Sequence, residues 1–252
     1  MAVPPAMAPR EWAARQDLAA AYRLAALNGW DDTIYTHISA AVPGEPGAYL
    51  INPYGLLFDE VCASNLVKVD VHGRKLCGSP HPVNPTGFAI HGAIHAACPD
   101  AACVLHLHTP WGMALSMVPG GLLPTTQHAM RLWGRLGRHA YEGLALTAEE
   151  GARLVHNLGA HDGLILENHG TLTVGATVAE AYMLMHHLER AAQAQLRAMA
   201  ACAGRAEVLQ ASPATAERTL VQWLGDGSER DGDSEWPALR RRLDKMDRSY
   251  QR

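Results

Sequence analysis

Hydrophobic and polar positions along the chain follow two periods, one typical of helices and the other of strands. From Glu11 to Leu27 apolar residues recur at near-helical spacing, and Asn28-Gly29 follows as a helix-terminating signal. Further helical patterns occupy residues 86–98, 111–117, 147–158, 177–203, 212–224 and 236–246. Short apolar or alternating runs, bounded by Gly, Pro and Asn, predict strands at 33–39, 49–51, 66–71, 102–108, 163–167 and 171–174.

This succession of strands and helices predicts an α/β protein, and the long hairpins near the N-terminus argue against a purely parallel sheet. Residues 1–10 are rich in Pro and Ala, so we expect them to be disordered. Residues 11–203 are then expected to form one domain. Residues 204–252, which contain an acidic, glycine-rich stretch at 225–235, are expected to form a C-terminal helical arm.

Composition narrows the class of protein. With 252 residues, 48% of them hydrophobic, the chain is long enough to bury a core without disulfides. Its net charge of −4 argues against a nucleic-acid partner. The five cysteines are an odd number without a CxxC pair, which indicates reduced thiols and a cytoplasmic location. The N-terminus does not read as a signal peptide and no run of 18 apolar residues occurs, so we expect no membrane partner.

Histidines are concentrated in the middle of the chain, where ten of the 14 lie between His81 and His169. Such a concentration indicates metal chemistry or proton transfer, or merely a biased composition. His106 and His108 form the sharpest pattern, because residues i and i+2 of a strand point to the same face. Two neutral imidazoles at a strand end are half of a Zn²⁺, Fe²⁺ or Co²⁺ site, although an HxH pair also arises by chance.

His169 is the candidate third ligand, since it occupies a turn, Glu167-Asn168-His169-Gly170, between two predicted strands. Three histidine ligands leave a coordination position open, which is typical of catalytic rather than structural metal sites. The alternative interpretation is that His169 is a surface turn residue.

Six motifs follow one another in a specific order and spacing. They are THIS (36–39), LINPYG (50–55), SNLVKVD (64–70), NPTGFAIHGAIH (84–95), PDAACVLHLHTP (99–110) and ENHG (167–170). In these motifs the chain resembles, over residues 18–196, the class II aldolase and adducin superfamily. The resemblance implies a single-domain α/β/α sandwich around a central, mostly antiparallel or mixed sheet.

The resemblance also implies a metal site and an assembly. A divalent ion, usually zinc with Fe²⁺, Mn²⁺ or Co²⁺ as alternatives, is expected on His106, His108 and His169. The active sites are expected at the subunit interfaces of a homotetramer that acts on a small molecule.

The sequence departs from the sugar-phosphate aldolases of this superfamily at two places. The position of their acid/base glutamate corresponds to Gly87. Their phosphate-binding turns correspond to Thr36-His37 and Tyr54-Gly55, and such large side chains suit a phosphate nest poorly. We therefore nominate His91, on the helix before the His106 strand, as an acid/base or an extra ligand. The remaining candidates are Tyr54 for catalysis and His37, Tyr54, Gly55 and Thr86 for substrate binding.

Three functions are compatible with these features. The first is a metal-dependent lyase that cleaves a non-phosphorylated hydroxy- or keto-acid by retro-aldol reaction or decarboxylation. The second is a non-heme iron oxygenase acting on an aryl-pyruvate, as in some relatives that also depart from the sugar-phosphate pattern. The third is a non-catalytic, adducin-like interaction module, against which the complete set of three histidines argues. The substrate is not fixed by the sequence.

Overall fold

A seven-stranded sheet runs through the centre of the computed structural model, which describes residues 7–144, 147–203, 205–227 and 230–252. The strands are β1 (His37–Ala41), β2 (Ala48–Ile51), β3 (Val67–Asp70), β4 (Cys103–Leu107), β5 (Leu136–His139), β6 (Gly163–Leu166) and β7 (Gly170–Gly175). Their order is β3-β2-β1-β4-β7-β6-β5, and every neighbouring pair is antiparallel except β5 and β6. The expectation of a mixed, mostly antiparallel sheet is confirmed.

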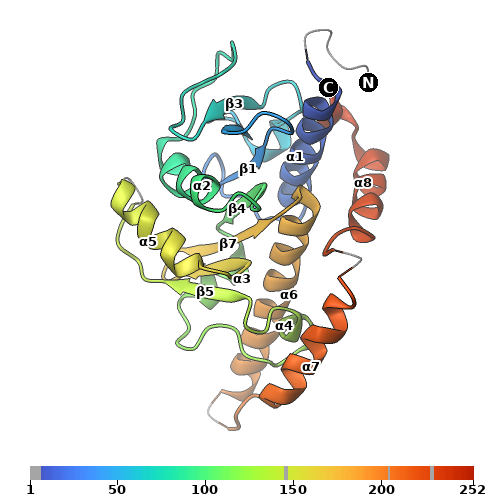
Figure 1. Ribbon diagram of the computed structural model, residues 1–252. Helices are drawn as coiled ribbons and strands as arrows, with labels where there is room; N and C mark the ends of the chain where they lie inside the picture. The colour runs from blue at the N-terminus through green and yellow to red at the C-terminus, as the bar shows by residue number, and fades with distance from the viewer. Residues whose placement is uncertain (1–6, 145–146, 204, 228–229) are drawn as a thin grey trace.

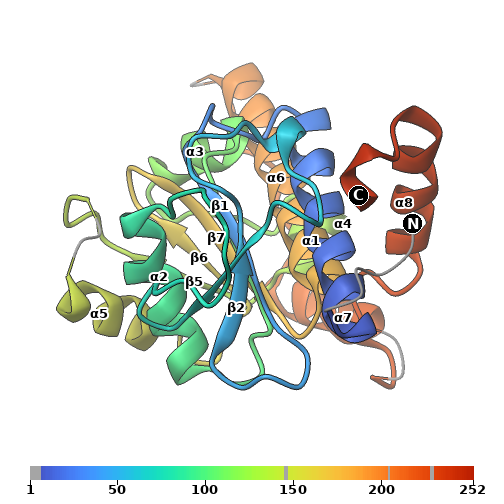
Figure 2. The same cartoon turned by 90° about the horizontal axis from the view of Figure 1, so that it is seen from above.

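Helices cover both faces of this sheet (Figures 1 and 2). They are α1 (Pro9–Leu27), α2 (Pro85–Ala97), α3 (Pro110–Ser116), α4 (Gln127–Arg131), α5 (Ala148–Leu158), α6 (Val178–Cys202), α7 (Pro213–Leu224) and α8 (Glu235–Met246), with short 3₁₀ turns at Phe58–Glu60 and Ser249–Gln251. Helices α2 and α5 pack on one face, and α1, α3 and α6 on the other. The predicted α/β/α sandwich is therefore confirmed.

The structure differs from the predicted elements at a few places. The first strand begins at His37 rather than Thr33, because Thr33 and Thr36 have φ angles of +52° and +63°, which no strand accommodates. Strand β5 and helix α4 were not predicted, since both are short and β5 contains Arg138 and His139. The first helix begins at Pro9, and residues 1–6 lie outside the described residues.

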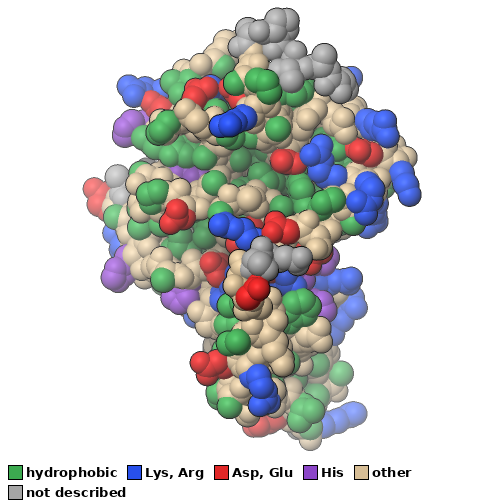
Figure 3. All heavy atoms as spheres, turned by 45° about the vertical axis from the view of Figure 1, so that its right-hand side comes forward, with side chains coloured by type: hydrophobic (Ala, Val, Ile, Leu, Met, Phe, Trp, Pro, Cys, Tyr) green, Lys and Arg blue, Asp and Glu red, His purple; other side chains and the backbone are tan. Residues whose placement is uncertain are grey.

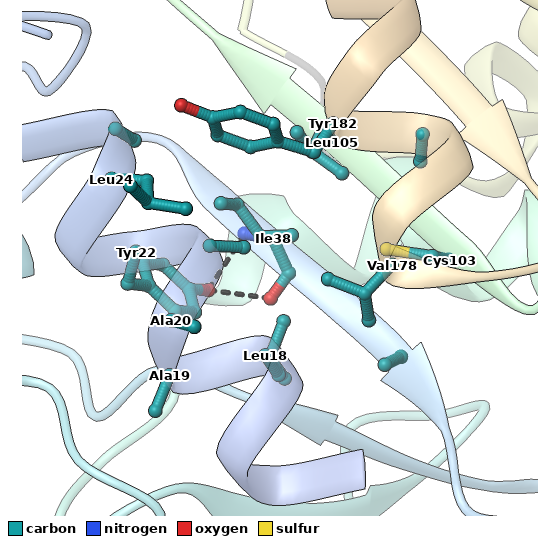
Figure 4. Packing of buried hydrophobic residues seen from close by; sticks show 14 of the residues in the cluster. Leu18, Ala19, Ala20, Tyr22, Leu24, Ile38, Cys103, Leu105, Val178 and Tyr182 are labelled. Atoms are coloured by element: carbon teal, nitrogen blue, oxygen red, sulfur yellow. Dashed lines mark hydrogen bonds between the residues drawn. The ribbon is translucent and has the colours of Figure 1, made fainter. Parts of the chain in front are cut away.

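The largest part of the core lies between the sheet and helices α1 and α6 (Figure 4). The buried hydroxyl of Tyr22, on α1, donates to the Ile38 carbonyl oxygen and accepts from the Ile38 N–H at 2.7 Å. The Asn52 N–H also donates to it, at 3.3 Å. One buried phenol thereby ties α1 to β1 and to the residue that follows β2, in a place where water cannot compete for the same groups.

The C-terminal segment packs on the domain in part and projects from it in part. Trp236 of α8 joins the main core, 5.5 Å from the Tyr182 ring, and Tyr250 is completely buried. Helix α7 and the end of α6 extend away from the sheet, as the narrow lower part of Figure 3 shows. Large apolar side chains are exposed along α7 and before it, at Val221, Trp223, Leu224 and Leu209. Within the described ranges, no helix has the length and hydropathy that a membrane span requires.

We predict that Tyr22→Phe lowers the free energy of unfolding by about 1–3 kcal/mol, because two buried N–H donors lose their acceptor. Urea denaturation followed by circular dichroism measures this change. Tyr35→Phe is the matched control, since its side chain is 51% exposed. Equal stability of the two variants would contradict the role given to the Tyr22 hydroxyl.

Candidate functional site

Three histidines that lie far apart in the sequence converge at one end of the sheet. His106 is in β4, His108 follows that strand, and His169 lies in the turn between β6 and β7. Ring nitrogens of the three side chains lie within 4.8 Å of one another. We call this group the histidine triad. The structure thus brings together the three residues that the sequence nominated as metal ligands.

Local backbone geometry explains how His169 reaches the other two. Asn168 adopts a φ of +55°, a left-handed conformation that Asn tolerates better than most residues and that reverses the chain sharply. A Cβ atom at Gly170 would lie only 2.7 Å from the carbonyl oxygen of Leu107, so only glycine allows β7 to approach β4 this closely. The ring of His169 therefore lies 4.7 Å from that of His106 and 4.9 Å from that of His108.

Hydrogen bonds on the outer side of the triad orient two of its rings. His106 donates from Nδ1 to the carbonyl oxygen of Thr171 at 3.2 Å, and His108 donates from Nδ1 to the Asp32 carboxylate at 2.8 Å. In its neutral form, each ring therefore keeps its lone pair on Nε2. The Nε2 atom of His108 is buried and has no partner among the described residues. Both features fit a metal ligand, because metal-binding histidines are typically held by such a second hydrogen bond.

Two rings of the triad, those of His106 and His169, are uncharged at neutral pH. Burial lowers the pKa of His106 far below its ordinary value, and the neighbouring His169, His37 and His108 lower it further. Burial likewise lowers the pKa of His169 to about 4, with His108 and His139 adding to the effect. Because only a neutral imidazole binds a metal ion, no proton has to be removed from these two rings before an ion binds.

His37 and His91 form a second pair of rings beside the triad. His37 pairs with His106 across β1 and β4, and their ring centres are 5.3 Å apart. Nδ1 of His37 lies 2.8 Å from Nε2 of His91, which is completely buried on α2. The His37 ring also covers Gly87, where an added Cβ would lie 3.1–3.3 Å from its atoms. His37 thus occupies the space that a side chain at position 87 would need, and His91 reaches the triad through His37.

The structure places the other nominated residues less closely. Tyr54 and Gly55 lie in the loop after β2, half-buried and exposed respectively. The backbone N–H of Tyr54 donates to the carbonyl oxygen of Pro82 at 3.0 Å. Within the described part of the chain, no ring contact or hydrogen bond joins the Tyr54 side chain to the triad. The side chain of Thr86 lies outside the described residues.

Two residues near the triad escaped prediction from the sequence. Asp32 holds His108, although 76 positions separate them and no motif connects the two. Tyr141 follows β5, is 52% exposed, and places its ring centre 6.1 Å from that of His169. A small cavity beside His169 is lined by Tyr141, His139 and Glu142, among others. Only the pairing of β5 with β6, which the sequence pattern did not reveal, brings this loop to the site.

Comparison with known proteins gives a consistent result. Residues 16–196 match the family model described as "Class II Aldolase and Adducin N-terminal domain". A protein of Caulobacter vibrioides, named only as an aldolase class 2 protein, is 49% identical over 240 residues, which cover 95% of this chain and 92% of the relative. Alpha-adducin of Rattus norvegicus is 41% identical over 243 residues, which cover 92% of this chain but 33% of that protein.

A solved structure extends the similarity to three dimensions. L-fuculose 1-phosphate aldolase from Glaciozyma antarctica superimposes with a TM-score of 0.83 and 28% sequence identity. The superposition covers 99% of this chain and 97% of the other. The fold therefore extends over the C-terminal helices as well as the sheet.

We predict that Asp32→Asn weakens metal binding by about 10- to 100-fold, because the amide orients the His108 ring less firmly than the carboxylate does. Competition with a chromophoric zinc chelator measures the affinity. Asp31→Asn is the matched control, since it removes a neighbouring carboxylate while Asp32, the one bonded to His108, is kept. Identical affinities in the two variants would contradict the orienting role of Asp32.

We also predict that the metal-free protein loses stability as the pH falls from about 6.5 towards 4. The pKa values of His95 and His169 are about 4 in the folded protein and 6.5 in the unfolded chain, so the unfolded chain binds more protons in this interval. Urea midpoints at pH 7 and pH 5 test this. His169→Gln should show a weaker dependence than wild type, and His156→Gln, at an exposed position, an unchanged one. A midpoint independent of pH would contradict the prediction.

Proposed function

Because the chain belongs to the class II aldolase and adducin family, we propose that it is a divalent-metal-dependent lyase. Its reaction is the cleavage of a carbon–carbon bond, by retro-aldol reaction or decarboxylation, in a non-phosphorylated hydroxy- or keto-acid. The observation that carries this proposal is the histidine triad, with two of its rings fixed from behind and the Nε2 atom of His108 buried without a partner.

The donor set indicates the kind of ion and its role. Three neutral imidazoles without a carboxylate suit Zn²⁺ first, and Fe²⁺, Mn²⁺ or Co²⁺ as well. A divalent ion held by His106, His108 and His169 would supply Lewis acidity to the carbonyl or carboxylate oxygen of a substrate. To bind the ion, such an oxygen needs a coordination position that the three histidine ligands leave open.

The chain's own residues contribute orientation and proton handling. His37 lies against His106, and His91 holds His37 by a hydrogen bond, so the pair is placed beside a substrate bound at the triad. We assign to His37 and His91 the task of accepting or returning the proton that the reaction moves. Tyr54, in the loop after β2, is proposed as a further catalytic and substrate-binding residue, and Gly55 and Thr86 as further substrate-binding residues.

The same geometry argues for a substrate without a phosphate group. A backbone nest for phosphate needs several free N–H groups and small side chains. Here the N–H of Tyr54 is already bonded to Pro82, Pro85 has no N–H, and the His37 ring fills the space above Gly87. A carboxylate needs fewer donors and can bind through the metal ion.

The proposal includes a homo-oligomer, a tetramer by resemblance to the family, located in the cytoplasm. The apolar side chains exposed on α7 support self-association, because exposed apolar clusters commonly mark protein–protein contacts. Interface active sites follow from the same resemblance.

Two other functions remain as candidates, each favoured by one observation. Three histidines with open coordination positions can hold Fe²⁺ as well as Zn²⁺, which favours an oxygenase reaction on an aryl-pyruvate. The 41% identity to alpha-adducin favours a non-catalytic interaction module.

We predict that His106→Ala and His169→Ala reduce the metal content from about one ion per chain to near zero, since each removes one of three ligands. Elemental analysis of freshly purified protein measures it, with His156→Ala at an exposed position as the control. Undiminished metal in the triad variants would refute the site.

The reaction is then tested with the metal-loaded wild type and a panel of hydroxy-, keto- and aryl-pyruvic acids under anaerobic and aerobic conditions. Product formed without oxygen, and lost in the triad variants, is the expected result. Bound iron with oxygen consumption would replace the lyase by the oxygenase. If the wild type binds no divalent metal near neutral pH, both metal-dependent reactions are excluded and the non-catalytic interaction module is supported.

A further inference from the structure

A continuous line of hydrogen bonds connects the sheet with helix α2 and ends at His37, beside the triad. It begins at the backbone carbonyl oxygen of Ala101, which lies 3.0 Å from Nδ1 of His95. Nε2 of His95 lies 2.7 Å from Oγ of Ser39, and that oxygen lies 2.5 Å from Nδ1 of His91. Nε2 of His91 lies 2.8 Å from Nδ1 of His37. Four hydrogen bonds therefore connect a main-chain oxygen to the ring beside His106.

The members of this line are held rigidly and away from water. His37, Ser39, His91 and His95 have exposed fractions of 3%, 1%, 0% and 6%. The ring of His95 stacks on that of Tyr49, with centres 4.1 Å apart and planes at 19°. His37 and Ser39 lie on the same face of β1, and His91 and His95 on the same face of α2, so each pair is aligned by its own backbone.

All three rings are neutral at neutral pH. They are buried, and their ring nitrogens bond to one another, to Ser39 and to the Ala101 carbonyl oxygen rather than to a carboxylate, so these contacts stabilise no charged ring. At the end of the line far from the triad, burial lowers the pKa of His95 to about 4. A neutral imidazole carries one N–H donor and one acceptor nitrogen, and a hydroxyl group donates one proton. The donor and the acceptor of every hydrogen bond in the line then follow from the first bond, the one to the carbonyl oxygen of Ala101.

A carbonyl oxygen only accepts, so Nδ1 of His95 carries the ring's proton and Nε2 of His95 accepts. The Ser39 hydroxyl must donate to that nitrogen, and its oxygen is left to accept from Nδ1 of His91. Nε2 of His91 then accepts from Nδ1 of His37. The remaining nitrogen of His37, Nε2, therefore carries a lone pair.

The position of His37 gives this deduction a functional meaning. Its ring lies between His91 and His106, and an added Cβ on Gly87 would lie 3.3 Å from its Nε2 atom. Because Nδ1 faces His91, the acceptor nitrogen Nε2 is on the other side of a ring whose centre lies 5.3 Å from that of His106. An acceptor at this point attracts a hydroxyl group and repels a second carboxylate or phosphate oxygen, because two lone pairs would face each other.

We infer that the carbonyl oxygen of Ala101 sets the tautomer of His37 through His95, Ser39 and His91, so that His37 offers Nε2 as an acceptor for a substrate hydroxyl group. Ser39 and His95 are then positioning residues that never touch the substrate. The inferred substrate class is a hydroxy-acid, with its hydroxyl group beside the oxygen atoms that bind at the triad. This second part rests on the proposed function, whereas the tautomer does not.

Two-dimensional ¹⁵N–¹H NMR of the full-length protein labelled in its histidine rings tests the tautomer directly. Wild type should show His37, His91 and His95 each protonated at Nδ1, with or without zinc. In Ser39→Ala the line is interrupted, so His37 and His91 should show a mixture of tautomers. Thr173→Val is the matched control, because it removes another buried hydroxyl from the same sheet, one that bonds to Ala181, and it should leave all three tautomers unchanged.

The substrate class is tested with glycolate and acetate, which share a carboxylate and differ by one hydroxyl group. The ratio of their dissociation constants for the zinc-loaded protein should favour glycolate, and Ser39→Ala should reduce that preference by a factor of about 2–10, the value of one hydrogen bond. Ser39→Thr, which keeps the hydroxyl, should restore it.

Protonation of His37 at Nε2 in wild type would overturn the inference without any variant being needed. An unchanged His37 tautomer in a folded Ser39→Ala protein would overturn the role of Ser39. An equal preference for glycolate in wild type and Ser39→Ala would overturn the substrate class. Failure of zinc to bind the triad would defeat the proposed function, while the tautomers of the metal-free protein would still decide the inference.

Discussion

The pairing of β4 with β1 on one side and β7 on the other is the constraint on which the site depends. It sets His37 opposite His106 and brings the turn with His169 to the end of the same strand. Antiparallel register has a period of two, so a shift by one residue would turn His106 and His37 to the opposite face of the sheet. The apolar residues Ile38, Leu105 and Leu107, which alternate with the histidines, fix that register by filling the core beneath α1 and α6.

Local patterns predicted much of this architecture. The alternation in residues 102–108 correctly placed His106 and His108 on one face, and the Asn-His-Gly turn correctly separated two strands. The edge strand β5 was missed, since four residues that include Arg138 and His139 carry little strand signal. Its parallel partner β6 is what defines it, and that pairing is not visible in any local window.

Residue type and strand periodicity predicted some residues of the site but not the contacts between distant segments. The triad followed from an HxH pattern and a turn, whereas Asp32 belongs to a loop whose contact with His108 exists only in three dimensions. The ring of His95 stacks on that of Tyr49. Its hydrogen bonds to Ser39 and Ala101 could not be foreseen, because they depend on how α2 crosses the sheet.

The central position of β4 in the sheet also determines how the site can unfold. Opening the triad locally would require β4 to leave β1, whose residues lie about 65 positions earlier, or β7, which lies a similar distance later. Neither neighbour can detach without exposing the apolar side chains buried on both faces of the sheet. The amide protons of β4 should therefore exchange with solvent only through global unfolding, so that the ligand-binding end of this protein belongs to its most stable cooperative unit. In many enzymes the site is instead carried by loops that open independently, whereas here loops contribute Asp32 and Tyr141 next to histidines that the sheet positions.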